Sequence, residues 1–365
     1  MNKYSISNRL DDIKLFNKLF TLKNTIDSDL SVVNKEFFPE LFKNSQWKYI
    51  KSGSTGHTLR GKVKLNNNDF NFGMKIVAYP IKKYYGKPTD ENRPENAELR
   101  MLQRLSKLAI DNNLLHVVFP ISNFTMSLKP FIYLKDYNVI KHDRFDEFVK
   151  KYREKSFYEE ASILISEWAN MGDFLDYLRD NYKKISVLEW KVFLFQIIAT
   201  LAIIQEEFPH FRHNDLKANN ILIHKISKDT KFFRYKIRDK FYKVPNIGFI
   251  LKIWDFDFSC IKDDIKNHKV NMNWTKKINV IYEQNRYYDI HYFFSTLTMK
   301  GFIPNLFKYI DEEIKSFMLR IVPNNVRTPS RHCTDRGRIL VRKELTTPRK
   351  ILKYDSLFES FVVNE

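Results

Sequence analysis

A short polar stretch of the chain combines a carboxylate, a lysine and an amide at fixed spacing. Its residues are Asp215, Lys217 and Asn220, and an apolar Ile-Leu-Ile run follows them. Transfer of a phosphoryl group needs a carboxylate beside the attacking hydroxyl, a cation near the moving phosphate and a metal ligand close by. Asp215 would accept or orient the hydroxyl proton, Lys217 would neutralise charge on the γ-phosphate, and Asn220 would offer its side-chain oxygen to Mg²⁺. The types and spacing of these residues therefore predict phosphoryl transfer.

A second carboxylate stands at the end of an apolar strand. Asp255 follows the run Lys-Ile-Trp and precedes Phe256, Asp257 and Phe258. A carboxylate at a strand terminus can bind a metal ion that bridges the β- and γ-phosphates. An Asp-Phe pair alone carries little information, and the alternative is that Asp215 and Asp255 are loop acids with no shared role. The two motifs together favour the metal-site interpretation.

With these motifs the chain resembles the protein kinase family over nearly all of residues 47–320. The resemblance implies an α+β, bilobal, protein-kinase-like fold with a small antiparallel-sheet N-lobe and a mainly helical C-lobe. It implies ATP and Mg²⁺ as cofactors and protein Ser or Thr as substrate, because tyrosine kinases of the family usually carry a different residue or spacing at Lys217. Residues 1–45 are then an N-terminal extension, residues 46–169 the N-lobe and hinge, and residues 170–365 the C-lobe.

Residues 50–58, Ile-Lys-Ser-Gly-Ser-Thr-Gly-His-Thr, resemble the glycine-rich loop over the phosphates. Gly53 and Gly56 match the second and third glycines of that loop, whereas Lys51 stands at the position of the first and Thr58 where a valine is usual. An ordinary hairpin turn would explain the same residues. By resemblance, Gly53 and Gly56 are candidate ATP-binding residues.

Lys75 resembles the strand lysine that contacts the α- and β-phosphates, and Glu98 resembles its ion-pair partner on a helix. Leu102 and Leu105 follow Glu98 at i+4 and i+7 and would anchor that helix. Glu95 is the alternative partner. A surface lysine on an edge strand is the alternative interpretation of Lys75.

Residues 163–173 resemble the hinge between the lobes, where adenine would bond the backbone carbonyl of Glu167 and the amide of Ala169. A buried strand leading to a helix cap is compatible with the same residues. Farther along, Asp289 resembles the acid at a helix start that holds the catalytic loop in place. A plain helix N-cap is the alternative for Asp289.

Three departures from the family pattern bear on regulation. Asn214 stands where most kinases carry an arginine that answers a phosphate on the activation segment, so activation by phosphorylation is not expected. Asp257 replaces a glycine, which makes a backbone flip at this position harder. No Ala-Pro-Glu motif occurs between Asp255 and Asp289, so the usual substrate-docking floor is not expected either.

The catalytic motifs taken together resemble a narrower group. His-Asn-Asp-Leu-Lys, Asp-Phe-Asp-Phe and the helix start Tyr-Tyr-Asp-Ile-His-Tyr-Phe-Phe are similar to the virion-associated serine/threonine kinases of poxviruses and related large cytoplasmic DNA viruses. The stretch from Thr346 also resembles the ends of those proteins. The resemblance implies a viral kinase located in the host cytoplasm or the virion.

The formal net charge of +19 is large enough to affect partners. A basic surface attracts nucleic acid, anionic membrane or acidic protein, although compositional drift toward lysine would give the same count. Residues 224–250 form a basic insertion that is a β-hairpin or a loop, and either a flap near the active site or a solvated charged surface. Its basic residues are Lys225, Lys228, Lys231, Arg234, Lys236, Arg238, Lys240 and Lys243.

Cysteine content and hydropathy indicate the redox compartment of the chain and whether it could enter a membrane. Cys260 and Cys333 cannot build a disulfide framework and have no metal-type spacing, which fits a reducing compartment. The N-terminus has no apolar signal core. The longest apolar stretch, Val192–Ile204, is about a dozen residues and too short to span a bilayer. We expect a soluble protein without a transmembrane segment.

Apolar periodicity predicts the elements that position these residues. Strands with a turn at residues 66–69 are expected within 47–77, and further strands within 116–168. Helices are expected around residues 13–20, 94–108, 142–156, 173–180, 187–208 and 286–300, with more helix after 301 and an irregular basic stretch from 327 to 353.

Two other functions remain open at this point. A small-molecule phosphotransferase of the aminoglycoside-kinase type shares the carboxylate and the amide, but its loop typically lacks the lysine at position 217. A pseudokinase would be a nucleotide-binding scaffold without turnover. The presence of Lys75, Asp215, Asn220 and Asp255 argues against a pseudokinase.

Overall fold

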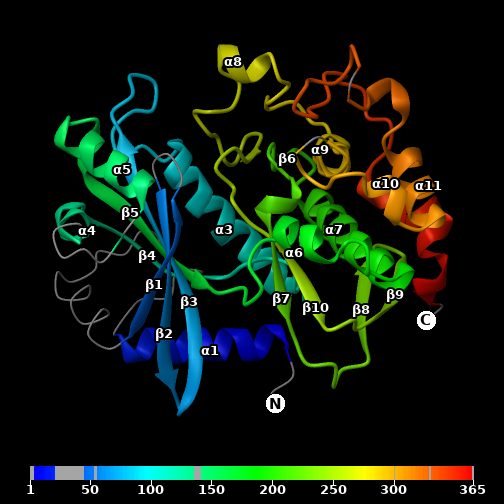
Figure 1. The fold of residues 1–365 in the computed structure, drawn as a ribbon, viewed down its shortest axis with the longest axis horizontal. Coiled ribbons are helices and arrows are strands. Elements are labelled where there is room, and N and C mark those ends of the chain that lie inside the picture. The colour runs from blue at the N-terminus through cyan, green and yellow to red at the C-terminus, as the bar shows by residue number, and fades with distance from the viewer. Residues whose placement is uncertain are drawn as a thin grey trace. The chain divides into compact units, whose positions relative to one another are not determined.

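The computed structural model describes residues 4–20, 45–52, 56–134, 140, 142–299, 301–328 and 330–363. The chain divides into two units (Figure 1). One, here called the sheet unit, comprises residues 6–107 and 118–168. The other, the helical unit, comprises residues 1–5, 108–117 and 169–365.

The sheet unit is built on five antiparallel strands in the order β1-β2-β3-β5-β4. The strands are β1 (Gln46–Ser52), β2 (Gly56–Leu65), β3 (Asn68–Pro80), β4 (Pro120–Ser127) and β5 (Phe157–Glu167). Its helices are α1 (Ile6–Leu19), α3 (Pro94–Asp111, whose last turn is grouped with the helical unit), α4 (Lys129–Tyr133) and α5 (Asp143–Arg153).

The turn between β2 and β3 follows from its sequence. Asn66 and Asn67 both have positive φ, at 47° and 65°. Two successive left-handed residues make the turn that matches the twist of a hairpin, and asparagine adopts this conformation at low cost. The expected turn at residues 66–69 is confirmed, and it sets the register that places Thr58 opposite Lys75.

Helix α1 packs against the sheet of its own unit. Phe16 is fully buried, with its ring 4.8 Å from that of Phe72, and Asn17 donates a hydrogen bond of 3.3 Å to the carbonyl of Ile121. Burial of one such aromatic side chain stabilises a fold by about 1.5–3 kcal/mol. Leu19, expected on the apolar side of this helix, is 48% exposed because the helix ends there.

Most of the described helices lie in the helical unit, whose strands form two pairs and one three-stranded sheet. The helices are α6 (Phe174–Asn181), α7 (Val187–Glu207), α8 (Asn273–Lys276), α9 (Tyr288–Leu297), α10 (Leu306–Tyr309), α11 (Glu312–Ile321) and α12 (Pro348–Tyr354), with 3₁₀ turns η1 (Ala218–Asn220), η2 (Asn324–Val326) and η3 (Ser356–Phe361). The strands are β6 (Phe211–Arg212), β7 (Ile221–Lys225), β8 (Phe232–Ile237), β9 (Lys240–Pro245), β10 (Phe249–Ile253), β11 (Cys260–Ile261) and β12 (Val362–Val363).

Helix α7 is the core of the helical unit. A capping box between Ser186 and Glu189 starts the helix, and nearly every side chain from Val192 to Ile204 is buried. By length and composition alone this helix could cross a membrane, but 78% of its apolar window is buried inside the fold, as expected of a core helix. Helix α7 extends beyond the apolar stretch Val192–Ile204 at both ends, and these added turns contain polar residues.

The basic insertion is a hairpin that belongs to a three-stranded sheet. Strand β9 pairs with β8 on one side and with the C-terminal β12 on the other. Tyr235 and Tyr242 point inward, where their rings lie 5.1 and 5.2 Å from that of Phe195 on α7. Of the two alternatives for residues 224–250, a β-hairpin or a loop, the structure contains the hairpin. The inner face of this hairpin is apolar.

The α+β class expected from the sequence is confirmed. An antiparallel sheet with helices makes up one unit, and the other is mainly helical (Figure 1). The chain passes between the units before Leu108 and after Val117 and Trp168.

Candidate active site

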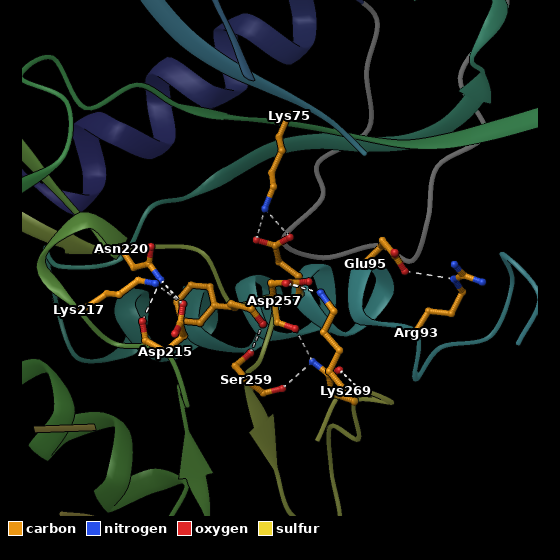
Figure 2. A network of polar contacts seen from close by, with 12 residues as sticks. Lys75, Arg93, Glu95, Asp215, Lys217, Asn220, Asp257, Ser259 and Lys269 are labelled. Atoms are coloured by element: carbon orange, nitrogen blue, oxygen red, sulfur yellow. Dashed lines mark hydrogen bonds and ion pairs between the residues drawn. The ribbon is translucent and has the colours of Figure 1, made fainter. Parts of the chain in front are cut away.

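The catalytic loop, residues 213–220, lies between β6 and β7 in the helical unit. Asp215 Oδ2 accepts a hydrogen bond from Asn220 Nδ2 at 2.9 Å and forms an ion pair with Lys217 Nζ at 3.1 Å. Figure 2 shows both side chains pointing at the Asp215 carboxylate. The structure thus brings together the three residues singled out by their spacing.

The backbone of this loop is held by a buried acid on α9. The amides of His213 and Asn214 each donate a 2.8 Å hydrogen bond to the carboxylate of Asp289. Burial raises the pKa of Asp289, while His213 and the two amide hydrogen bonds act in the opposite direction. Because the carboxylate accepts from the loop, Asp289 is not a plain N-cap of its own helix, which has no side-chain cap.

Asn214 has a conformation that suits its residue type. Its φ of 63° lies in the left-handed region, which asparagine enters more readily than most residues. Its side-chain amide donates to the carbonyl of Phe258 at 3.0 Å. The residue that replaces the usual arginine therefore bonds the start of the activation segment directly.

The Asp-Phe-Asp-Phe motif is joined to the catalytic loop by its neighbours. His213 Nε2 lies 3.0 Å from the carbonyl of Trp254, and the amide of Trp254 donates to the carbonyl of Asn220 at 3.0 Å. Asp255 follows directly with φ of 64°. These bonds place Asp255 and Asn220 on adjacent segments of the same unit.

The donor set in these segments fits a hard divalent cation. Asn220 directs its amide nitrogen at both the carbonyl and the carboxylate of Asp215, which leaves Oδ1 as its metal-binding atom. A carboxylate and an amide oxygen are the ligand types that Mg²⁺ prefers, with phosphate oxygens and water completing its shell. Within the described ranges no cluster of three or more acidic, His or Cys side chains forms an all-protein metal cage.

In the sheet unit, Lys75 pairs with Glu98. Lys75 Nζ, on β3, lies 2.7 and 2.8 Å from the two carboxylate oxygens of Glu98 on α3. The alternative partner, Glu95, instead binds the buried Arg93 at 3.2 Å (Figure 2). Since β3 is the central strand of its sheet, Lys75 is not an edge-strand surface lysine. Leu102 and Leu105 are fully buried and anchor the helix.

The glycine-rich loop can be followed only in part. Gly53 lies outside the described residues, and Gly56 begins β2. A Cβ at Gly56 would meet Val77 at 3.4 Å and the Lys75 side chain at 4.0 Å, so this glycine lies beside Lys75. The next residue, His57, is buried among aromatic rings, and burial lowers its pKa to about 4.

The two hinge residues fall in different units and are described separately. Glu167 ends β5, and its carboxylate accepts hydrogen bonds from Arg9 on α1 at 2.6 and 2.7 Å and from the amide of Phe119 at 2.9 Å. Ala169 begins the next part of the helical unit and is buried. The bond between Arg9 and Glu167 has no signal in the sequence.

Two further basic side chains in the helical unit contact aspartates of the two sequence motifs. Lys269 forms an ion pair with Asp257 (Figure 2), and the nearby Asn267 donates to the carbonyl of Asp257 at 3.0 Å. Arg338, from the irregular C-terminal stretch, donates to Asp215 Oδ1. Neither cation belongs to a recognisable motif, so sequence reasoning missed both.

Comparison with known proteins gives matches over most of the chain. The family model for protein tyrosine and serine/threonine kinases matches residues 130–283. A protein of Acanthamoeba polyphaga mimivirus, provisionally named serine/threonine-protein kinase R400, is 43% identical over 326 residues, which cover 87% of this chain and 69% of that protein.

Two more distant viral relatives match smaller parts. A second mimivirus protein, provisionally named serine/threonine-protein kinase R301, is 26% identical over 286 residues, or 69% of each chain. Serine/threonine-protein kinase 2 of fowlpox virus is 31% identical over 202 residues, which cover 52% of this chain and 41% of the relative.

Proposed function

This chain belongs to the protein kinase family and is a serine/threonine kinase of a viral type, and we propose that it works with the residues described above. The observation that carries the proposal is the Asp215 carboxylate, which is bonded by Lys217 and Asn220 in a loop held by Asp289. Kinases of this family generally use ATP and Mg²⁺. For this chain, we infer ATP as the phosphoryl donor.

In the proposed reaction, the oxygen of a serine or threonine hydroxyl attacks the γ-phosphorus of ATP. The bond from this phosphorus to the β–γ bridging oxygen breaks, and ADP leaves. Asp215 accepts the hydroxyl proton, and Lys217 neutralises charge on the transferred group. Both side chains are already in contact in the structure, so little reorganisation is needed.

Asn220 and Asp255 would hold the metal ion. Bound Mg²⁺ would supply charge neutralisation to the β- and γ-phosphate oxygens. Asp255 follows Trp254, whose amide is bonded to the carbonyl of Asn220, so the two ligand residues are held together before any ion binds.

The nucleotide residues come from the sheet unit and the hinge. Lys75, oriented by Glu98, would contact the α- and β-phosphates, with Gly53 and Gly56 covering them. The carbonyl of Glu167 and the amide of Ala169 would bond the adenine. The glycine at 56 suits close approach of the backbone to a phosphate.

A turnover assay separates this function from its alternatives. Wild-type enzyme is given Mg²⁺ and ATP labelled at the γ-phosphate, together with casein, histone or kanamycin as acceptor. We expect label on serine and threonine of protein, and none with Asp215→Asn. Label on kanamycin alone would indicate a small-molecule phosphotransferase, and ATP binding without transfer to any acceptor or to itself would indicate a pseudokinase.

The environment and further partners of the enzyme are proposed from its charge and its relatives. We propose a location in the host cytoplasm or the virion, because the catalytic motifs resemble those of virion-associated viral kinases. The net charge of +19 supports contact with an acidic protein, nucleic acid or anionic membrane through basic segments such as the β8–β9 hairpin. Fractionation of infected cells with an antibody to this chain tests the location.

A further inference from the structure

Arg338 reaches the catalytic carboxylate from a distant part of the sequence. It lies between η2 and α12, and only 8% of the residue is exposed. Its Nη2 donates to Asp215 Oδ1, and its Nη1 donates to the carbonyl of Asn214 and, at 3.0 Å, to the hydroxyl of Tyr288. We propose that Arg338 is a positioning residue for phosphoryl transfer, which fixes the Asp215 carboxylate in its reactive orientation. This inference rests on the proposed function.

The carboxylate is held from both sides. Oδ1 accepts from Arg338, and Oδ2 accepts from Lys217 and Asn220. Rotation of an aspartate carboxylate about its last torsion is otherwise broad, so donors on both oxygens remove this freedom. Each carboxylate oxygen has two lone pairs, so Oδ1 can still accept a bond from a substrate hydroxyl.

The guanidinium group suits this position better than an ammonium would. One nitrogen bonds a backbone carbonyl of the catalytic loop while the other bonds the carboxylate, and the planar fork fixes their relative direction. The same group lies 4.4 Å from the ring centre of Tyr292, on α9. In this loop, Asn214 stands at the position where an arginine is usual. Arg338, which is 123 residues from Asp215 in the sequence, supplies a guanidinium group to the loop.

The segment that carries Arg338 is itself firmly packed. Thr334 donates its amide to the carbonyl of Arg338 at 2.9 Å and accepts the Arg338 amide at 3.0 Å on its hydroxyl. Gly337 has φ of 79°, and a Cβ there would come within 2.6 Å of the Met299 sulfur at the end of α9. We therefore expect this turn to stay in place when substrate binds, unlike an autoinhibitory plug, which must leave first.

Steady-state kinetics of Arg338→Ala and Arg338→Lys test the role, with Arg336→Ala as the control. Arg336 is exposed on the same segment. We expect kcat to fall about 100-fold in Arg338→Ala with the KM for ATP unchanged, because misplacement of a reacting group by about 1 Å costs this much. Lysine should restore only part of kcat, since it cannot bond both acceptors. Arg336→Ala should match wild type.

Guanidinium rescue separates positioning from folding. Guanidinium chloride at low millimolar concentration should raise the kcat of Arg338→Ala, while sodium chloride at equal ionic strength should not. A folding defect would instead lower the fraction of active enzyme, and guanidinium would not repair it. A thermal melt with and without Mg²⁺-ATP measures that fraction independently.

The following outcomes would overturn the inference. A higher kcat in Arg338→Ala would mean that the contact is autoinhibitory, and an unchanged kcat would mean that it has no role. Loss of kcat without guanidinium rescue, or equal loss in Arg336→Ala, would assign the effect to folding. Failure of wild-type enzyme to phosphorylate any protein would overturn the proposed function itself, and Arg338 would lose its role with it.

Discussion

The two units hold their functional side chains in different ways. In the sheet unit, Lys75 Nζ contacts both carboxylate oxygens of Glu98, which lies on a neighbouring element. In the helical unit, Asp215 depends on a network that includes Asp289 and Arg338, from segments far apart in the sequence. Donors and acceptors from several distant segments share the task of holding the Asp215 loop, so no single bond holds it alone. The difference predicts where the enzyme is most sensitive.

The largest effects should come from the two charged groups themselves. We expect Asp215→Asn and Lys75→Met each to reduce single-turnover transfer by about 10²–10⁴-fold, because each removes a positioned base or charge clamp. Both proteins should melt cooperatively near the wild-type temperature. Asp229→Asn and Lys64→Met, at surface positions of the two units, are matched controls and should keep wild-type rates. Near wild-type turnover in either test variant would show that its role is misassigned.

A smaller effect concerns the stability of the sheet unit at acidic pH. Burial lowers the pKa of His57 to about 4 in the folded state, against 6.5 for the free side chain. The unfolded chain therefore binds the proton first, so the stabilising contribution of neutral His57 is complete above pH 6.5 and is lost as pH falls toward 4.

His57→Gln should reduce this pH dependence. Glutamine can still accept from the Tyr49 hydroxyl, which lies 2.7 Å from His57 Nδ1, and it does not titrate. Urea unfolding at pH 7 and pH 5 should show a loss of about 1–2 kcal/mol on acidification in wild type and less in the variant. His332→Gln, at a partly exposed position, serves as the control. An equal loss in wild type and His57→Gln would rule His57 out as the cause.

The activation segment should work without a phosphate. Asn214 bonds the carbonyl of Phe258, and Lys269 pairs with Asp257, so contacts within the chain hold the start of the segment. Phosphatase treatment should therefore leave the initial rate unchanged. Lys269→Met should lower it about fivefold, the effect of losing about 1 kcal/mol. A rate that falls after phosphatase and returns on phosphorylation between Asp257 and Tyr288 would contradict this prediction.

The smallest effect is expected at the β8–β9 hairpin. Lys236 lies on its outer face, and Arg238 lies in its turn, where it pairs with Glu206. Lys240 begins β9 on the same side as Ile237 and donates to the carbonyl of Lys353. Charge reversal at these three positions should raise KM for an acidic protein substrate by about two- to threefold at low salt, and less at higher salt, where the Debye length shortens to about 8 Å. The KM for ATP should not change.

The control for the hairpin is charge reversal at Lys82, Lys83 and Lys87, which are exposed in the sheet unit. If both triple variants raise KM equally, net charge is responsible and the hairpin has no specific role. If neither changes KM, the hairpin is a solvated surface over an apolar inner face.

Much of the site could be predicted because its residues are close in sequence. Asp215, Lys217 and Asn220 lie within one loop, and their spacing alone places them around one carboxylate. Glu98 could be chosen over Glu95 because the leucines that anchor α3 follow it at helical spacing. Turn chemistry at residues 66–69 likewise determined the hairpin whose register sets Lys75 opposite Thr58.

The tertiary structure decided the contacts that span long separations. Arg338 meets Asp215, and Arg9 meets Glu167 across 158 residues, although each arginine lies in a stretch without a motif. The basic hairpin similarly gained its place by packing on Phe195 of α7 and by pairing with β12, more than a hundred residues later in the chain.

The contacts that could be predicted differ from those that could not in how far apart along the sequence the interacting residues lie. Propensity, turn geometry and apolar periodicity act over a few residues, so the sequence by itself determined the elements, the catalytic loop and the chemistry they support. A long cationic side chain has similar local preferences whether it faces solvent or a buried acid. Which of the 62 lysines and arginines would meet Asp215 besides its neighbour Lys217 was decided only when α9 and the turn at Gly337 packed together and removed Arg338 from water.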